Sequence, residues 1–328
     1  MTTKLIGLDN GSGIINLIYF TETNNILCNG LKLTGDPDVY TKTFTNASST
    51  GRYGPSLTQI RTVYGAWSND SSVFDEGAYQ GYQLWTIPYD GIYKIKVYGA
   101  QGGRSGYSTN GYAYGGKGAW TEGSFVFTAG TKIQIIVGQA GSDGVYGTAP
   151  YVGGGGGGAS WVLSEDLSVL YAVAGGGGGA NAQNYAQGYG TDGGTTQANL
   201  ADSTGGGTYG WQGSGGGAGF TSDGQNGGQN NSQGLRPANT CVGGDYGYYN
   251  VNYTQFISGV GGFGGGAGNG AEAGGGGGGY GGGVAVNYNI SPGAYGGTSR
   301  NNGTDISFGT HTDPHGKVEI VKISDIIN

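Results

Sequence analysis

Residues 153–180 read GGGGGGASWVLSEDLSVLYAVAGGGGGA and place two short apolar stretches between two uninterrupted glycine tracts. Ser160 to Leu163 and Val169 to Val173 predict strands, because short runs rich in β-branched and aromatic residues favour extended backbone. The flanking tracts, Gly153 to Gly158 and Gly175 to Gly179, do not fit an α-helix, since each glycine costs about 1 kcal/mol inside one. The fold must therefore combine β-strands with long stretches of backbone that carry no side chains.

The composition excludes several protein classes. The chain has 328 residues, of which 79 are glycine and 25 are tyrosine, and only 11% are charged. The glycines keep no three-residue period, which excludes a collagen triple helix. No apolar run approaches the roughly 20 residues of a membrane helix, so we expect no membrane insertion. The net charge of −7 argues against nucleic acid as a partner, because phosphate binding requires clustered cations.

Short strands separated by turn signals recur along the chain. In Ile92 to Tyr98 lysines alternate with apolar residues, so this strand should bury one face and expose the other. Leu57 to Val63 fits either a short strand or a helical turn. The other predicted strands are Ile14 to Phe20, Val39 to Thr45, Leu84 to Ile87, Ser124 to Thr128, Lys132 to Val137 and Lys317 to Lys322. This pattern predicts an all-β fold built as an antiparallel β-sandwich.

The glycine tracts allow two interpretations. Glycine-rich chain is ordinarily flexible linker. Alternatively, extended glycine helices with three residues per turn could pack side by side and hydrogen-bond to their neighbours, anchored at both ends by the sandwich. We favour this ordered bundle, and its predicted structural glycines are Gly153, Gly156, Gly175, Gly178, Gly215, Gly264, Gly276 and Gly282.

Residues 84–180 resemble the glycine-rich domain family. The resemblance rests on Trp85-Thr86-Ile87-Pro88-Tyr89-Asp90-Gly91, on Val97-Tyr98-Gly99-Ala100-Gln101-Gly102-Gly103, and on the tracts quoted above. This family is similar to the glycine-rich ectodomain of the anaplastic lymphoma kinase receptors and also occurs in bacterial and bacteriophage surface proteins. It implies a jelly-roll-like sandwich from which polyglycine II helices project, and it brings no catalytic motif.

A second resemblance lies upstream, in Thr43 to Ala47, Gly51 to Leu57 and Gln59 to Arg61, which are similar to a segment preceding this domain in phage tail-fibre proteins. Residues 1–75 contain only isolated glycines, unlike the rest of the chain. This change in composition predicts three parts. Residues 1–75 are an attachment or oligomerisation region rich in β-structure, residues 76–323 are the glycine-rich sandwich with its bundle, and residues 324–328 are a tail. The N-terminus has no charged leader before an apolar core, so it does not predict a secretory signal.

These features predict a non-enzymatic structural protein of a bacteriophage virion, either a tail fibre or adhesin or a decoration protein. It would be assembled in the host cytoplasm, bind other virion proteins and form a homo-oligomer, with a trimer as the usual state of a fibre. One alternative is a cell-surface or matrix glycine-rich binding module. A second is a tail-associated glycan depolymerase, which would use paired carboxylates among Asp70, Asp75 and Glu76, or Glu165 and Asp166.

Tyrosines gather in three segments between glycine stretches, and they are the candidate ligand-binding residues. Tyrosine with Asn, Ser and Gly gives large rigid contact area and adaptable hydrogen bonding, which suits a glycan or protein on a host surface. The alternative is that these rings pack along the glycine bundle. The candidates are Tyr246, Tyr248, Tyr249, Tyr253, Tyr112, Tyr114, Tyr185 and Tyr189.

Other chemistry-bearing residues give weaker signals. His311, Asp313 and His315 stand within five residues and are the only candidate metal ligands, but a polar turn explains them better than a metal site. No cofactor is expected. Cys28 and Cys241 lie far apart in the sequence, so both are expected to be free thiols, as in a reducing compartment.

Overall fold

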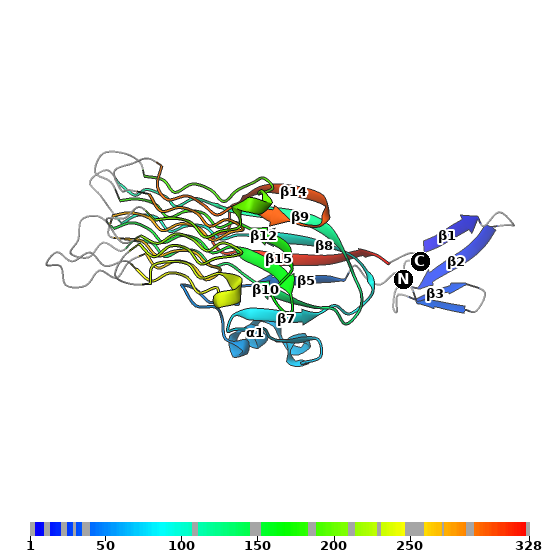
Figure 1. The fold of residues 1–328 in the computed structure, drawn as a ribbon. Helices are drawn as coiled ribbons and strands as arrows, with labels where there is room; N and C mark the ends of the chain where they lie inside the picture. Colours follow the sequence, from blue (N-terminus) through cyan, green and yellow to red (C-terminus); the bar gives the residue numbers. More distant parts are fainter. Residues whose placement is uncertain are drawn as a thin grey trace.

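The computed structural model describes most of the chain. The described residues are 4–9, 14–20, 25–28, 31–34, 40–106, 111–144, 152–182, 188–208, 214–227, 231–246, 259–270, 272–286 and 292–325. They form a two-layer antiparallel sandwich, a bundle of extended glycine-rich segments that leaves one end of it, and a separate small sheet (Figure 1).

The sandwich confirms the all-β prediction. One layer has the strand order β13-β12-β11-β10-β7-β6, and the other has the order β14-β9-β8-β15-β5. The strands of the first layer are β6 (Phe74–Glu76), β7 (Tyr82–Thr86), β10 (Lys132–Ile136), β11 (Ser160–Ser164), β12 (Leu170–Ala174) and β13 (Arg300–Asn301). The strands of the second layer are β5 (Thr41–Thr45), β8 (Gly91–Tyr98), β9 (Gly118–Phe127), β14 (Thr304–His311) and β15 (Lys317–Ser324).

The inward-facing residues of both layers form one apolar core. In β8 the predicted alternation is confirmed, because Tyr93, Ile95 and Val97 are buried and the two lysines between them are not. These side chains pack with others from the opposite layer, among them Trp85 and Ile135. Each fully buried aliphatic side chain contributes about 1.5–3 kcal/mol, so this core supplies the main anchor for the glycine segments.

Residues 40–75 are built into the sandwich. β5 pairs with β15, and Phe44 of β5 lies in the apolar core with Phe74 of β6. The predicted boundary at residue 75 therefore falls inside the sandwich, because the polar composition of this stretch conceals its few large core side chains.

The segment that fitted either a strand or a helical turn is a helix, α1 (Leu57–Tyr64). The capping box explains this: Ser56 accepts a hydrogen bond from the Gln59 N–H, and the Gln59 side chain accepts one from the Ser56 N–H. Tyr64 at its end accepts a hydrogen bond from the Thr45 N–H at 2.7 Å, and burial raises the pKa of Tyr64 to about 12. The short 3-10 helices are η1 (Ala66–Asn69), η2 (Leu200–Asp202) and η3 (Pro237–Asn239). No described helix has the length and apolar character needed to cross a bilayer.

The glycine segments form an ordered bundle. Along residues 154–158 the N–H groups donate in rotation to three different neighbouring segments, and the rotation repeats after three residues. The donors and acceptors are Gly154 to Ala180, Gly155 to Ser142, Gly156 to Ala267, Gly157 to Gly177 and Gly158 to Gln139. Donors at 275 and 278 return in the same way to Gly154 and Gly157. A repeat of three residues is that of a polyglycine II helix, whose backbone groups point outward to its neighbours.

The eight predicted structural glycines lie within the described part of this region. All are buried except Gly282, which is half-buried. Gly264 differs from the prediction, because its φ of +103° places it in a turn and not in an extended helix. There its N–H donates to the carbonyl of Cys241.

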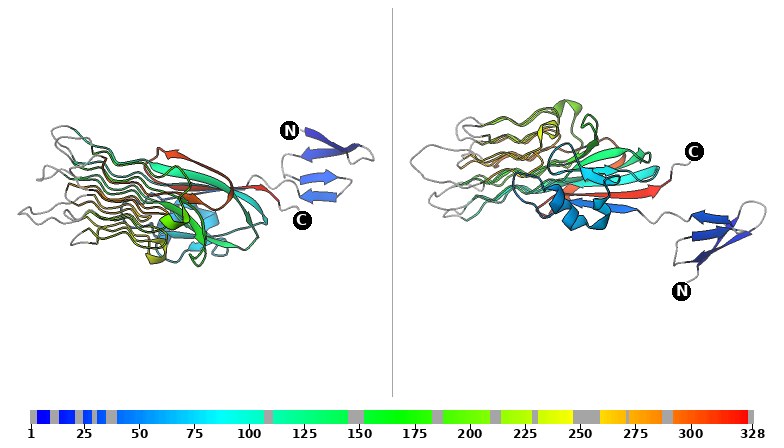
Figure 2. Two further views of the ribbon diagram at one scale, coloured as in Figure 1. Left: turned by 45° about the horizontal axis from the view of Figure 1, so that its top comes forward. Right: turned by 90° about the horizontal axis from the view of Figure 1, so that it is seen from below.

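A separate four-stranded antiparallel sheet precedes the sandwich. Its strands are β1 (Lys4–Asp9), β2 (Ile14–Phe20), β3 (Asn25–Cys28) and β4 (Leu31–Thr34), paired in that order. Of these, only β2 was predicted. Figure 2 shows this sheet beyond the end of the sandwich that is opposite to the bundle.

Candidate functional site: a tyrosine flank on the glycine bundle

Three bundle segments, residues 111–116, 188–194 and 292–297, lie side by side along one flank. The Gly190 N–H donates to the carbonyl of Tyr114, and the Gly293 N–H donates to the carbonyl of Tyr189. These backbone bonds bring together residues that are distant in the sequence. The Tyr114 and Tyr189 side chains meet across two of these segments.

Exposed tyrosines stand on all three segments. Tyr114 and Tyr189 stack with their ring centroids 6.3 Å apart and their planes 6° from parallel. Tyr112 precedes this pair, and Tyr295 lies on the third segment. The four rings, which we call the tyrosine flank, are between 38% and 61% exposed, so they are available to a ligand. Sequence analysis missed Tyr295, although its setting in Gly293-Ala294-Tyr295-Gly296-Gly297 has the same glycine-embedded pattern.

Charged groups border the tyrosine flank at one edge. The Arg104 guanidinium lies 4.8 Å from the centroid of the Tyr112 ring, in cation–π geometry. Arg104 also pairs with Asp143 at 2.6 Å, and both side chains are about half exposed. The flank thus combines flat aromatic surface, phenol hydroxyls and an ion pair at its margin. Such a surface can stack on apolar ligand faces and hydrogen-bond at their edges.

The other predicted tyrosines do not join this surface in the described structure. Tyr246 is partly buried at the end of a different segment, next to Asp245. Tyr185, Tyr248, Tyr249 and Tyr253 lie outside the described residues. The tyrosine clusters around residues 112 and 189 are brought together, and the cluster around residue 250 is represented only by Tyr246.

The Gly51 to Leu57 motif ties the sandwich to the bundle. The Phe263 N–H donates to the carbonyl of Gly51, and the Arg52 Nε–H donates to the carbonyl of Gly243. Arg52 also forms an ion pair with Asp245. Gly54 lies against the Phe263 ring, where an added Cβ would come within 2.7 Å of a ring carbon. The motif therefore has a structural role at this junction.

The candidate metal ligands His311, Asp313 and His315 lie at the end of β14 and in the turn to β15, which hydrogen-bonds to the Ala140 backbone. His315 Nδ1 accepts a hydrogen bond from the Ala140 N–H at 3.1 Å, which fixes its proton on Nε2 in the neutral form. His311 Nε2 lies 3.1 Å from the carbonyl of His315 and 4.0 Å from the Asp313 carboxylate. Within the described residues, no group of three His, Cys, Asp or Glu side chains is arranged to hold a metal ion. Burial lowers the pKa of both imidazoles.

The carboxylates considered for glycan cleavage are engaged locally. Asp166 accepts hydrogen bonds from the Ser164 and Ser168 hydroxyls, which lower the pKa of Asp166 to about 2. Glu165 pairs with Lys132, and Asp75 pairs with Arg61. Cys241 is a free thiol, fully buried, and burial raises its pKa. Cys28 lies on β3.

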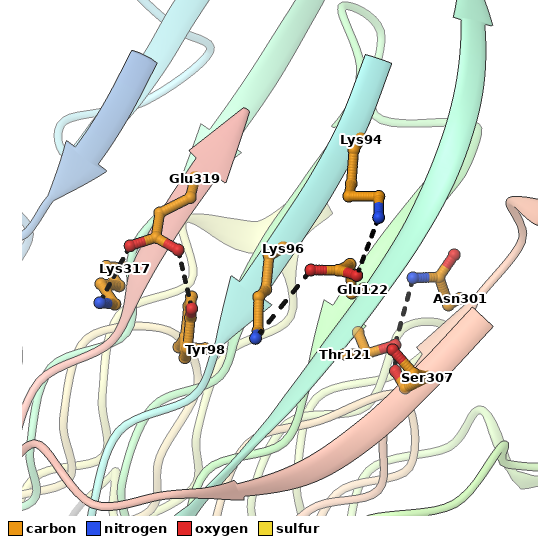
Figure 3. Close-up of polar contacts among 9 residues, drawn as sticks. All are labelled: Lys94, Lys96, Tyr98, Thr121, Glu122, Asn301, Ser307, Lys317 and Glu319. Atoms are coloured by element: carbon orange, nitrogen blue, oxygen red, sulfur yellow. Dashed lines mark hydrogen bonds and ion pairs between the residues drawn. The ribbon is translucent and has the colours of Figure 1, made fainter. Parts of the chain in front are cut away.

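The outer face of the β14-β9-β8-β15-β5 sheet carries a second polar cluster, drawn in Figure 3. Lys94 and Lys96 of β8 both approach Glu122 of β9, at 3.5 and 4.0 Å. On the other side of β8, Glu319 accepts a hydrogen bond from the Tyr98 hydroxyl and pairs with Lys317. The contacts of Glu122 with the two lysines and of Glu319 with Tyr98 join neighbouring strands as cross-strand pairs, whereas Lys317 and Glu319 lie on the same strand.

Comparison with known proteins gives a partial match to a receptor. No protein-family model matches the chain. The chain is 34% identical over 107 residues to the leukocyte tyrosine kinase receptor of Mus musculus. The match covers 33% of this chain, and it spans only about 12% of the receptor's length. The match agrees with the resemblance to the glycine-rich receptor ectodomains, and it gives no support to the resemblance to phage tail-fibre proteins.

Proposed function

We propose that this chain is a non-enzymatic structural and binding protein, whose glycine bundle presents the tyrosine flank to a glycan or protein on a cell surface. The observation that carries the proposal is the stack of Tyr114 on Tyr189, two exposed rings held by hydrogen bonds between backbone segments. Exposed aromatic rings on a rigid support lose little conformational entropy on binding, and they are common in recognition surfaces.

The bundle is suited to this role because its backbone is fixed on several sides. Each described glycine of residues 154–158 donates to a neighbouring segment, so the segments cannot move independently. Binding residues are often found where variable chain is carried on a rigid scaffold. We propose more specifically a virion protein, either a tail fibre or adhesin or a decoration protein, in which the separate β1–β4 sheet attaches the protein to the particle.

The alternative is a cell-surface or matrix glycine-rich binding module. The partial match to a tyrosine kinase receptor favours it. The two proposals share the binding flank and differ in where the protein resides. Mass spectrometry of purified phage particles from the source culture separates them, since a virion protein must be present there and a receptor-like module must be absent.

Substitution of the flank tests the binding role. We expect Tyr112→Ala, Tyr114→Ala and Tyr189→Ala, made together, to reduce binding of the labelled protein to host cells or isolated cell envelopes at least tenfold. The matched control is Tyr89→Ala, which removes an equally exposed ring from the sandwich and should leave binding unchanged. Binding that is equal for the triple variant and the control, with both proteins folded, would refute the flank as the binding surface.

A further inference from the structure

The turn between β14 and β15 contains an Asp–Pro peptide bond, in the sequence Thr312-Asp313-Pro314-His315. Such a bond is unusually prone to hydrolysis, because the aspartate carboxylate can reach its own backbone carbonyl carbon as a nucleophile. The proline nitrogen, which belongs to a tertiary amide, is also a better leaving group than an ordinary amide nitrogen. The chain has one further bond of this kind, Asp36–Pro37, which lies outside the described residues.

The backbone on both sides of the Asp313–Pro314 bond is held by Gln101, which follows β8. The Gln101 N–H donates to the carbonyl of Pro314 at 2.9 Å, and the Gln101 side-chain Nε2 donates to the carbonyl of Thr312 at 2.7 Å. The bond therefore lies between two anchored peptide groups. Reacting groups that are held in one place react faster than groups that meet at random.

The Asp313 carboxylate has an imidazole beside it and is otherwise open. Its side chain is 68% exposed, and His311 Nε2 lies 4.0 Å from Asp313 Oδ2. Groups that exchange a proton are often this far apart before the reaction begins. The buried His311 ring packs on Tyr98, with the ring centroids 4.8 Å apart, so its position is fixed. The other charged side chains that face His311 are Lys317 and Glu319 of β15.

We propose that the Asp313–Pro314 bond is a self-cleavage site. A carboxylate oxygen of Asp313 attacks the carbonyl carbon of the same residue and forms a five-membered cyclic anhydride, while the bond from that carbon to the Pro314 nitrogen breaks. The His311 imidazolium gives a proton to the departing nitrogen, which leaves as a secondary amine. Water then opens the anhydride, so that Asp313 ends the first fragment with two carboxyl groups and Pro314 begins the second.

Cleavage at this bond would leave the fold intact. The second fragment, residues 314–328, contains β15, which pairs with β8 on one side and with β5 on the other. Val318 and Ile320 of β15 are buried in the apolar core. The fragment therefore stays bound as a non-covalent strand. The reaction occurs once per chain and consumes only water, so it is compatible with a structural protein.

Intact-mass measurement under denaturing conditions tests the proposal on the full chain. We expect incubation at about pH 5.5 to convert the chain into residues 1–313 and 314–328, while native gel filtration shows one species of unchanged size. The Asp36–Pro37 bond is the internal reference, because it has the same chemistry away from the turn, and it should be cut at least tenfold more slowly. In concentrated urea the turn is lost, and the two bonds should be cut at similar rates.

Three substitutions separate the chemistry from the fold. Asp313→Glu keeps the charge on an exposed side chain but must close a six-membered ring, so cleavage should fall at least tenfold. His311→Gln keeps a donor for the His315 carbonyl but has no titrating proton, and it should slow cleavage by a similar factor. The matched control, His315→Asn, keeps both reacting groups and should be cleaved at the rate of the unmodified protein. Circular dichroism verifies that each variant is folded.

An unmodified chain that stays whole, or that is cut equally fast at both Asp–Pro bonds in its folded state, would overturn the proposal. A folded Asp313→Glu variant that is cleaved at the unmodified rate would overturn it as well. Unchanged cleavage of a folded His311→Gln variant would refute the proton transfer from His311. None of these outcomes bears on the binding role of the tyrosine flank, since the flank lies on the bundle.

Discussion

The sandwich and the glycine bundle are both tightly packed, but the sandwich packs through apolar side chains and the bundle packs through bare backbone. In the sandwich, β8 and β10 are joined through interlocking side chains such as Ile95 and Ile135, and the strand-to-strand backbone hydrogen bonds run within each layer. In the bundle, neighbouring segments approach until backbone meets backbone, and hydrogen bonds run to three neighbours in turn. We therefore expect the sandwich to lose stability when core side chains are shortened, and the bundle to lose stability when side chains are added to its glycines.

The largest expected effect follows from adding a side chain inside the bundle. A Cβ at Gly276 would lie 2.0 Å from the carbonyl oxygen of Gly283 and 2.8 Å from the nitrogen of Gly217. Neither neighbour is a flexible side chain, so Gly276→Val should lower the free energy of unfolding by roughly 4 kcal/mol, at the upper end of single substitutions. Denaturant unfolding followed by fluorescence measures this change.

The matched control for that change is Gly207→Val. The nearest atom to a Cβ at Gly207 is the Gln225 side-chain oxygen, 3.7 Å away, so the new side chain has room. We expect this variant to unfold within about 1 kcal/mol of the unmodified protein. Equal stability losses for the two valine variants would mean that tight packing of the bundle does not determine its stability.

The next largest effect follows from removing side-chain atoms from the sandwich core. Ile95 is fully buried on β8, at the centre of the core cluster. Ile95→Ala should cost about 3 kcal/mol, because the lost burial adds to the cavity that remains. Calorimetry would reveal whether the bundle and sandwich unfold in one transition. A loss below about 1 kcal/mol would indicate that the core repacks around the smaller side chain.

The contrast also explains how much the sequence could predict. The strands of the sandwich were found where side chains alternate, as in β8 and in the Val318 and Ile320 positions of β15. β14 was missed, because Thr304–His311 has little apolar character and contains Gly309. Its strand conformation depends on pairing with β9, and the Trp120 ring of β9 covers Gly309, where an added Cβ would come within 2.5 Å of the ring.

In the bundle, the sequence predicts the polyglycine II helices but not which helices lie next to one another. Glycine tracts indicated polyglycine II helices, yet one glycine hydrogen-bonds like any other, so no residue pattern specifies which segments become neighbours. The stack of Tyr114 on Tyr189 depends on that choice of neighbours. The sequence therefore identifies tyrosines as candidate ligand-binding residues, and the bundle geometry shows that Tyr114 and Tyr189 meet.

A smaller effect is expected from pH, at the turn that joins β14 and β15. Burial lowers the pKa of His315 and His311, so the folded protein binds these protons less readily than the unfolded chain does. The unfolded chain takes up protons as the pH falls below about 6.5, and stability contributed by the neutral imidazoles is lost from there downward. The free energy of unfolding should therefore decrease as the pH is lowered from 7 towards 5.

The variant His315→Asn isolates the imidazole contribution. The Asn carbonyl oxygen can accept the hydrogen bond from the Ala140 N–H in place of Nδ1, and it does not titrate. Its unfolding free energy should depend less on pH over this interval than that of the unmodified protein. Parallel pH profiles for the two proteins would show that His315 is not a source of the dependence.

The smallest expected effect concerns the charged outer face of the sandwich. Glu122 faces two lysines, Lys94 and Lys96, and all three side chains are partly exposed (Figure 3). Water and salt screen such pairs, so Glu122→Gln should cost less than about 1 kcal/mol at low ionic strength and close to nothing in about 1 M salt. A salt-independent loss above 2 kcal/mol would mean that this face is less accessible to solvent than the structure indicates.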